Sequence, residues 1–268
     1  MNKTGKYISE RKNLLSIYFT ADYPYKGSTK DIIVALQNAG ADLLEVGIPF
    51  SDPLADGVVI QKSSYKALEN GFLLDNLFAD LEEIRPQITI PLVLMGYFNT
   101  VLAYDVEKFL KKCHSLGIDT IIFPDLPPVI YVDRYADLFE KYDVSPVFLI
   151  TPQTSDLRIN YLNGLSKAFI YAVADNSITG ASADLSDKQL IYFNKIKATK
   201  FDVPVMIGFG ISDKKAYEKA CNYANGVIIG SAFIKSIENI TQDNQQNNQQ
   251  NNNEISKTIT DFIHSIKK

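Results

Sequence analysis

The sequence predicts an α/β protein folded as one (β/α)8 TIM barrel, and three observations support this. The chain has 268 residues, a length typical of a single closed α/β barrel. Eight short apolar segments recur along it, separated by longer stretches with helical periodicity. Several of these segments are apolar throughout, as expected of parallel strands covered on both faces. An open doubly wound sheet is the alternative, but that fold usually opens with a glycine-rich turn, and SIYFTADYP has none.

The elements follow from this alternation. The expected strands are residues 16–21, 41–47, 91–97, 119–125, 145–150, 168–173, 203–210 and 225–231. The expected helices are 28–39, 60–69 with 74–84, 105–116, 129–142, 155–165, 186–198, 212–223 and 254–267. We also expect a short N-terminal helix and an extra short helix (231–238) after the eighth strand. Ser28 or Thr29 is expected to cap the first long helix, and Ser212 the helix that follows the seventh strand.

One segment differs from the rest in composition. Residues 241–253, TQDNQQNNQQNNN, are nearly all Asn and Gln, a composition that cannot form a packed core. An apolar-periodic stretch follows it, with Ile255, Ile259, Phe262 and Ile266 on one face. We therefore expect a flexible loop within one domain that spans residues 1–268, and not a domain boundary.

Charge and composition exclude several classes of protein. The formal net charge is −4 with no basic run, which disfavours binding to nucleic acid. No run of about 18 apolar residues predicts a membrane helix, and the N-terminus lacks the apolar core of a secretory signal. Cys113 and Cys221 form no CxxC pair, so we expect reduced thiols and a cytoplasmic protein.

Three carboxylates lie at the expected end of the second strand, where barrel enzymes place their chemistry. Glu45 lies in the apolar segment ADLLEVGI, and burial there should raise its pKa. The loop PFSDPLADG then carries Asp52 and Asp56. Two carboxyl groups in contrasting surroundings suit paired acid–base work. The alternative is that Glu45 pairs with a lysine and both aspartates only shape the turn. Asp52, between serine and proline, is expected to be a structural residue of the turn.

Glycines follow the sixth, seventh and eighth strands. Gly208 and Gly210 end the seventh strand, Gly230 and Ser231 end the eighth, and the turn ITGAS supplies Gly180. Barrels often bind phosphate at this place, where backbone N–H groups and a helix N-terminus can approach the anion. The sequence therefore predicts a phosphorylated ligand.

Other chemistries lack their motifs. The only histidines, His114 and His264, lie in expected helices, and no HxH, HExxH or cysteine pair predicts a metal site. No GxSxG motif predicts a nucleophilic serine, and no expected strand ends in a lysine suited to a Schiff base.

Along nearly its whole length the chain resembles the tryptophan synthase alpha chain family. The most specific element is LLEVGIPFSDPLADGVVIQ, supported by YFTADYP, LMGYFN, FPDLPP, SITGA, IGFGIS and IIGSA in the family's order. The resemblance implies a lyase of tryptophan biosynthesis that cleaves indole-3-glycerol phosphate to indole and D-glyceraldehyde 3-phosphate by a retro-aldol step. It implies no metal or other cofactor in this chain. It also implies an α2β2 heterotetramer with a beta chain, in which pyridoxal phosphate joins the indole to L-serine.

The resemblance also assigns roles to residues. Glu45 matches the general acid–base that protonates C3 of the indole ring, and Asp56 the carboxylate that stays ionised and accepts a hydrogen bond from the indole N–H. The implied substrate-binding residues are Tyr18, Tyr171, Thr179 and Phe209, with Thr179 in a mobile lid. The implied phosphate-binding residues are Gly180, Gly210, Gly230 and Ser231. Tyr97, Asn99 and the PDLPP turn match loops that contact the beta chain.

Several residues depart from the family pattern. Asp22 replaces a glycine, Val58 a proline and Ser177 a lid glycine, and Asp175 is an unexpected acid before the lid. These departures bear on lid closure and allosteric coupling more than on the chemistry. The alternatives are another phosphate-binding barrel enzyme such as an isomerase, an alpha-like chain that mainly regulates a beta subunit, and a lyase that acts alone and releases free indole.

Overall fold

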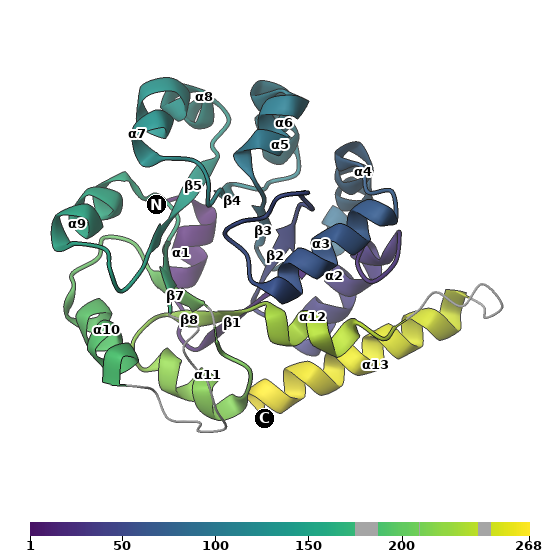
Figure 1. Ribbon diagram of the computed structural model, residues 1–268. Coiled ribbons are helices and arrows are strands. Elements are labelled where there is room, and N and C mark those ends of the chain that lie inside the picture. The colour runs from purple at the N-terminus through teal and green to yellow at the C-terminus, as the bar shows by residue number, and fades with distance from the viewer. Residues whose placement is uncertain (175–186, 209, 241–247) are drawn as a thin grey trace.

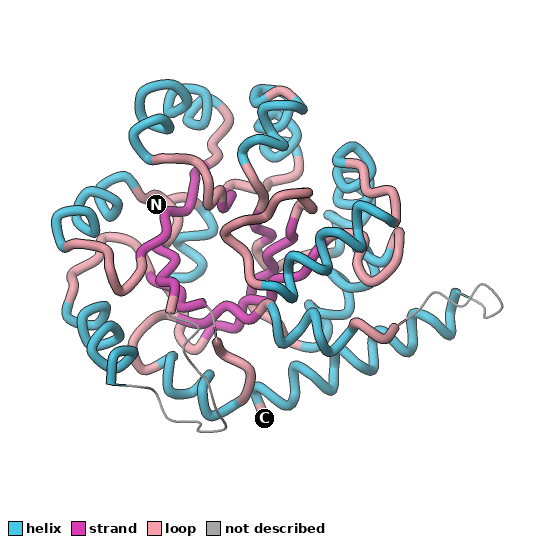
Figure 2. Tube along the Cα trace, in the orientation of Figure 1, coloured by secondary structure: helices cyan, strands magenta, loops and turns pink. Residues whose placement is uncertain are grey.

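Eight parallel strands pair in sequence order and close into a barrel, with β1 hydrogen-bonded to both β2 and β8. The computed structural model describes residues 1–174, 187–208, 210–240 and 248–268. Figure 2 shows the strands as a ring surrounded by helices. The strands are β1 Leu14–Thr20, β2 Leu43–Gly47, β3 Leu92–Met95, β4 Thr120–Ile122, β5 Ser145–Ile150, β6 Ile170–Val173, β7 Val205–Gly208 and β8 Gly226–Ile229. The predicted (β/α)8 fold is confirmed.

The helices lie outside the ring, apart from α1, which crosses one end of it (Figure 1). They are α1 Lys3–Ser9, α2 Ser28–Ala39, α3 Val58–Glu69, α4 Leu74–Ile84, α5 Phe98–Tyr104, α6 Val106–Ser115, α7 Pro128–Ile130, α8 Ala136–Lys141, α9 Asp156–Leu165, α10 Asp187–Ala198, α11 Lys214–Cys221, α12 Ser231–Ile237 and α13 Asn248–Lys267. A 3-10 turn (Arg85–Gln87) follows α4, and a π-helical turn (Tyr131–Tyr135) joins α7 to α8. Each predicted helix is present, and α5 is a further helix that the sequence pattern did not predict.

Alternation along the strands divides the core in two. Leu15, Ile17 and Phe19 of β1 belong to the large cluster packed between barrel and helices. Leu14 and Tyr18 belong to a smaller cluster that also includes Ile8 of α1. Because successive strand residues point to opposite faces, Glu45 points into the barrel while Leu44 and Val46 pack outward.

Two predicted helix caps are wrong. Ser28 is already helical and donates its hydroxyl hydrogen bond to Tyr25 O, while Gly27 takes the cap position at φ 83°. Asp213, not Ser212, caps α11, because its carboxylate accepts from the Ala216 N–H. At α2 the left-handed turn at Gly27 sets where the helix starts, whereas at α11 Ser212 and Asp213 are equally good cap residues by type and only the structure distinguishes them.

The Asn/Gln tract differs from the loop that we expected. Residues 248–253 form the start of α13, so the loop prediction is wrong for them, and residues 241–247 lie outside the described part of the chain. The amphipathic half of α13 buries Ile255, Ile259 and Ile266, and a helix once formed extends cheaply through residues such as Gln. That the whole chain is one domain stays a prediction. Among the described residues, no helix is long and apolar enough to cross a membrane.

Candidate active site

A cavity of about 460 Å³ opens at the carboxyl ends of the strands. Its walls come from β1, β2, β3, β6 and β8 and from the segments that follow β2, β7 and β8. The lining residues are Tyr18, Glu45, Asp56, Gly57, Val58, Val59, Ile60, Met95, Tyr171, Gly210, Ile211, Ser212, Ile228, Gly230, Ser231, Ala232 and Lys235. Both predicted carboxylates therefore lie at the same mouth of the barrel as the predicted phosphate glycines.

Glu45 is buried at the base of this cavity, with 1% of its surface exposed. The Ser16 hydroxyl donates a hydrogen bond to its Oε1 at 3.0 Å. Oε2 has no hydrogen-bond partner among the described residues. Burial raises the pKa of Glu45 to about 8, and the single bond from Ser16 opposes this shift only in part. The carboxyl group therefore holds its proton near neutral pH.

Asp56 lies in the loop between β2 and α3 and is 9% exposed. The Tyr97 hydroxyl donates to its Oδ2 at 3.1 Å and accepts a hydrogen bond from the Ala55 N–H at 2.9 Å. Oδ1 has no partner in the described part of the chain. Burial raises the pKa of Asp56 to about 6, and the Tyr97 hydrogen bond lowers it. Asp56 is thus mostly ionised at neutral pH, although its pKa is higher than the sequence suggested.

Two tyrosines stand inside the barrel against glycines of neighbouring strands. A Cβ atom on Gly47 would collide with the hydroxyl of Tyr18, and one on Gly208 with the hydroxyl of Tyr171. Burial raises the pKa of both tyrosines, so both keep their protons. The glycines at the ends of β2 and β7 therefore leave the space in which these rings stand.

Some predicted site residues can be placed and others cannot. Tyr18, Tyr171, Gly210, Gly230 and Ser231 line the cavity. Thr179, Gly180 and Phe209, together with the departures Asp175 and Ser177, lie outside the described residues. Asp52 is exposed, accepts a hydrogen bond from the Ser51 hydroxyl at 2.5 Å and does not line the cavity, consistent with a structural role.

Sequence reasoning missed several residues of the site. Ser16 lies two residues before Tyr18 and so faces the same way, a signal that period-2 alternation in β1 would have given. Tyr97 was matched only to loops that contact a beta chain, and its bond to Asp56 depends on how β3 and the β2–α3 loop meet. Lys235 and Ser212 also line the cavity.

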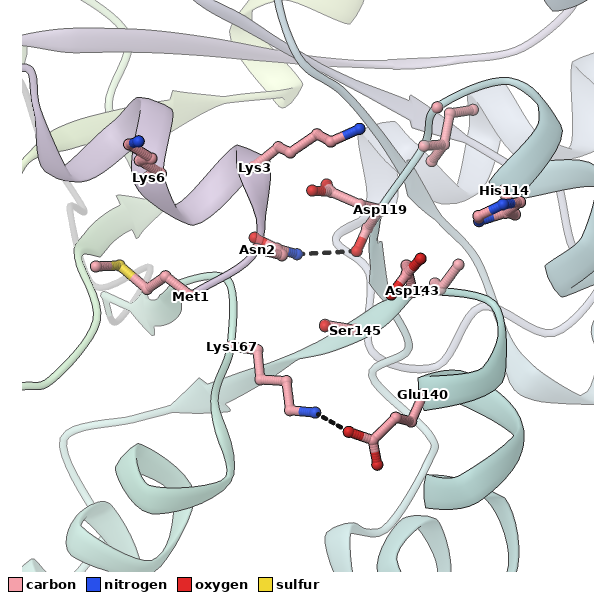
Figure 3. Close-up of a pocket in the computed structure, with 13 residues that line it drawn as sticks. Met1, Asn2, Lys3, Lys6, His114, Asp119, Glu140, Asp143, Ser145 and Lys167 are labelled. Carbon is pink, nitrogen blue, oxygen red and sulfur yellow. Dashed lines mark hydrogen bonds and ion pairs between the residues drawn. The ribbon is translucent and has the colours of Figure 1, made fainter.

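A second cavity, of about 510 Å³, lies at the opposite end of the barrel (Figure 3). Its walls come from α1 and from residues that precede β4, β5 and β6, such as Asp119, Asp143 and Lys167. Asn2 donates to the Asp119 carbonyl at 2.9 Å, and Lys167 pairs with Glu140 at 3.3 Å. The Asn2 contact holds the start of α1 over this end of the barrel, and the cavity contains neither predicted catalytic carboxylate.

Metal ligands do not gather in the described residues, where no three His, Cys, Asp or Glu side chains are placed to hold an ion. His114 lies on α6 and His264 on α13, both away from the cavity at the strand ends. The carboxyl groups, hydroxyls and backbone groups of the cavity suit acid–base chemistry on a polar organic substrate.

Several known proteins with similar sequences belong to one family. The family model described as "Tryptophan synthase alpha chain" matches residues 6–264. The tryptophan synthase alpha chain of Christiangramia forsetii is 49% identical over 244 residues, covering 91% of this chain and 95% of that protein. The Flavobacterium johnsoniae protein is 49% identical over 237 residues, covering 88% and 94%.

Solved structures agree with the sequence comparison. A chain of the tryptophan synthase complex of Pyrococcus furiosus superposes with a TM-score of 0.81 at 29% identity, covering 96% of this chain and 98% of that one. The alpha subunit of tryptophan synthase from Legionella pneumophila gives 0.81 at 30% identity, covering 99% and 100%.

Proposed function

Because the chain belongs to the tryptophan synthase alpha chain family, we propose that Glu45 and Asp56 together carry out its reaction. Members of the family are lyases of tryptophan biosynthesis that act on indole-3-glycerol phosphate. One observation supports the proposal above the rest. Each of the two buried carboxyl groups keeps one oxygen without a hydrogen-bond partner in the described structure, and both groups line the same cavity. Such oxygens are costly to bury unless a ligand satisfies them.

Glu45 starts the reaction as the acid. With a pKa of about 8 it carries a proton at neutral pH and can deliver it to C3 of the indole ring. The resulting carboxylate then takes the proton of the glycerol hydroxyl next to the bond that breaks. The carbon that bears this hydroxyl becomes the aldehyde carbon of glyceraldehyde 3-phosphate. The electrons of the broken carbon–carbon bond restore the C2–C3 double bond of indole. Glu45 ends with the proton that it started with, so one residue serves both steps.

Asp56 stabilises the charge that develops in between. Protonation at C3 makes the ring nitrogen positive, and an ionised carboxylate that accepts the indole N–H bond stabilises this species. A pKa of about 6 leaves Asp56 mostly ionised at pH 7. Tyr97 fixes the direction of the carboxylate through Oδ2 and leaves Oδ1 for the substrate.

The remaining predicted residues are proposed to bind the rest of the substrate. Tyr18 and Tyr171 stand beside Glu45 in the cavity, where their rings can contact the indole. Gly210, Gly230 and Ser231 are proposed to bind the phosphate group, because they lie together at the ends of β7 and β8. Thr179, Gly180 and Phe209 are proposed on the family resemblance alone.

Tryptophan synthase alpha chains work with a beta subunit. We propose that this chain forms an α2β2 heterotetramer, needs no cofactor of its own, and passes indole to a beta chain that uses pyridoxal phosphate. A cytoplasmic location is also proposed, supported by two cysteines that form no disulfide. Size-exclusion chromatography with light scattering on a mixture with the beta chain would test the stoichiometry.

The function is tested by measuring glyceraldehyde 3-phosphate released from indole-3-glycerol phosphate, with and without the beta chain. We expect Glu45→Gln to lower kcat at least about a thousandfold while circular dichroism stays unchanged. Asp52→Asn is the matched control, because Asp52 belongs to the same segment but lies outside the cavity. Near-normal turnover by Glu45→Gln would contradict the assignment.

A further inference from the structure

Lys235 lines the active-site cavity and has no function in the reaction described so far. It is the only lysine or arginine among the described residues of the cavity wall. Its side chain is exposed, and no acidic group in the described part of the chain lies within ion-pair distance of it. A cation on the wall of a cavity that contains two carboxyl groups, with no ion-pair partner among the described residues, has room to bind a ligand.

The charges in the cavity indicate a role for this cation. Asp56 is mostly ionised at neutral pH, and a phosphate monoester carries between about 1.5 and 2 negative charges. Without Lys235 the only ionisable carboxyl or amino side chains on the described wall would be the acidic Glu45 and Asp56, facing a ligand that is itself negative. Like charges in a partly buried site repel more strongly than in water. A cation placed away from the carboxylates offsets this repulsion.

The position of Lys235 in α12 directs it to the phosphate end. It follows Ser231 by four residues, so the two side chains share one face of the helix. Ser231, Gly230 and Gly210 line the same cavity, and Ser212 follows them from the β7–α11 turn. A lysine provides a compact charge on a flexible stem, which can meet an oxyanion without a fixed orientation.

We infer that Lys235 binds the phosphate group and makes the enzyme prefer phosphorylated over unphosphorylated indole-glycerol. This inference rests on the proposed function, and in particular on the phosphate lying near Ser231. Lys235 acts through charge, so its contribution belongs to substrate binding and not to the acid–base steps at Glu45.

The test compares Lys235→Gln and Lys235→Arg on indole-3-glycerol phosphate and on indole-3-glycerol, which lacks the phosphate. We expect Lys235→Gln to raise KM for the phosphorylated substrate about twofold to fivefold, the range of an exposed ion pair, with kcat nearly unchanged. The effect should shrink at high salt because screening weakens exposed charges, and arginine should restore most of the affinity. KM for the unphosphorylated substrate should not change.

Lys200→Gln is the matched control, since Lys200 is exposed, carries the same charge and precedes β7 at the other end of the barrel. Equal KM changes on both substrates, or no change on either, would overturn the inference. Calorimetric titration with glycerol 3-phosphate measures phosphate binding directly and so tests the inference about Lys235 apart from the proposed function. If the wild-type chain does not cleave indole-3-glycerol phosphate but Lys235→Gln still weakens glycerol 3-phosphate binding, the proposed function fails and the phosphate site stands.

Discussion

The hydroxyl of Ser16 lies 3.0 Å from Oε1 of Glu45 and gives this buried carboxyl its only hydrogen bond from the described residues. One neutral donor cannot compensate for the loss of water around a carboxylate. The protonated form is therefore favoured, and the pKa of Glu45 rises to about 8. The acid that the proposed reaction needs is thus produced by a scarcity of hydrogen-bond donors around Glu45.

The pH dependence of turnover should be bell-shaped. Glu45 must begin protonated, so kcat/KM should fall as the pH rises above about 8. Asp56 must be ionised, so kcat/KM should fall as the pH drops below about 6. Steady-state assays between pH 5 and 9.5 would check both limbs, whose apparent pKa values belong to the interacting pair. An activity that keeps rising to pH 9.5 would rule out Glu45 as the initial acid.

Glu45→Gln should increase stability, and increasingly so at higher pH. The unfolded chain loses the Glu45 proton near pH 4.5, whereas the folded chain keeps it up to about pH 8. Between these values the folded state binds more protons, so wild-type stability falls as pH rises. The amide cannot ionise and avoids this loss. Thermal melts at pH 5 and pH 8 should show that Glu45→Gln raises the melting temperature above that of the wild type by more at pH 8. An equal increase at both pH values would contradict the raised pKa of Glu45.

Tyr97→Phe should impair catalysis through Asp56. The change removes the hydrogen bond to Oδ2 and leaves the Ala55 N–H without its acceptor. We expect kcat to fall about tenfold, the loss of one hydrogen bond to a charged group, and the acid limb of the pH profile to move upward because the bond lowers the pKa of Asp56. The ring of Phe50 stacks on that of Tyr97 with 4.9 Å between the ring centroids, and it should keep the ring of the phenylalanine variant in place. An unchanged acid limb would show that Tyr97 serves only the loop.

Gly208→Ala should disturb the site from within the barrel. The new Cβ would occupy the place of the Tyr171 hydroxyl, and overpacking of this kind costs about 1 to 3 kcal/mol. The free energy of unfolding, measured by chemical denaturation, should fall. Since Tyr171 is proposed to contact the substrate, kcat/KM should fall as well, at least about tenfold. Gly164→Ala in α9 is the control, since its Cβ would meet open space and should be neutral or stabilising. Full activity in Gly208→Ala would contradict the proposed contact of Tyr171 with the substrate.

Lys267 should stabilise the barrel without affecting turnover. Its ammonium lies 2.7 Å from Asp42 Oδ2 and donates to Gly40 O, and the same Asp42 oxygen accepts from the Leu15 N–H. The pair is about a quarter exposed, so we expect Lys267→Met to lower the free energy of unfolding by only about 1 kcal/mol. Lys257→Met, an exposed lysine of α13, should have no effect. Equal melting temperatures for the two variants would contradict a stabilising role.

Much of this molecule could be predicted from residue patterns. The eight strands, the barrel and the position of Glu45 and Asp56 follow from apolar periodicity and from the rule that barrels place their chemistry at strand ends. The helix α5 was missed because FNTVLAY is short and follows β3 directly. The cap at Ser28 was wrong because the left-handed turn at Gly27 outweighed residue preference, and the cap at Ser212 because Asp213 is an equally good cap residue. The Asn/Gln tract was misjudged over 248–253, where composition gave no sign that α13 extends upstream.

The sequence by itself predicted that Glu45 and Asp56 lie at the cavity of the barrel, because Glu45 lies in an apolar strand and Asp56 in the shaped loop that follows it. Only the tertiary structure decided how strongly each holds its proton. That property depends on how completely the closed barrel removes water and on which donors reach each oxygen. Ser16 reaches Glu45 from β1, and Tyr97 reaches Asp56 from the end of β3. These contacts join residues 29 and 41 positions apart, which no local pattern records.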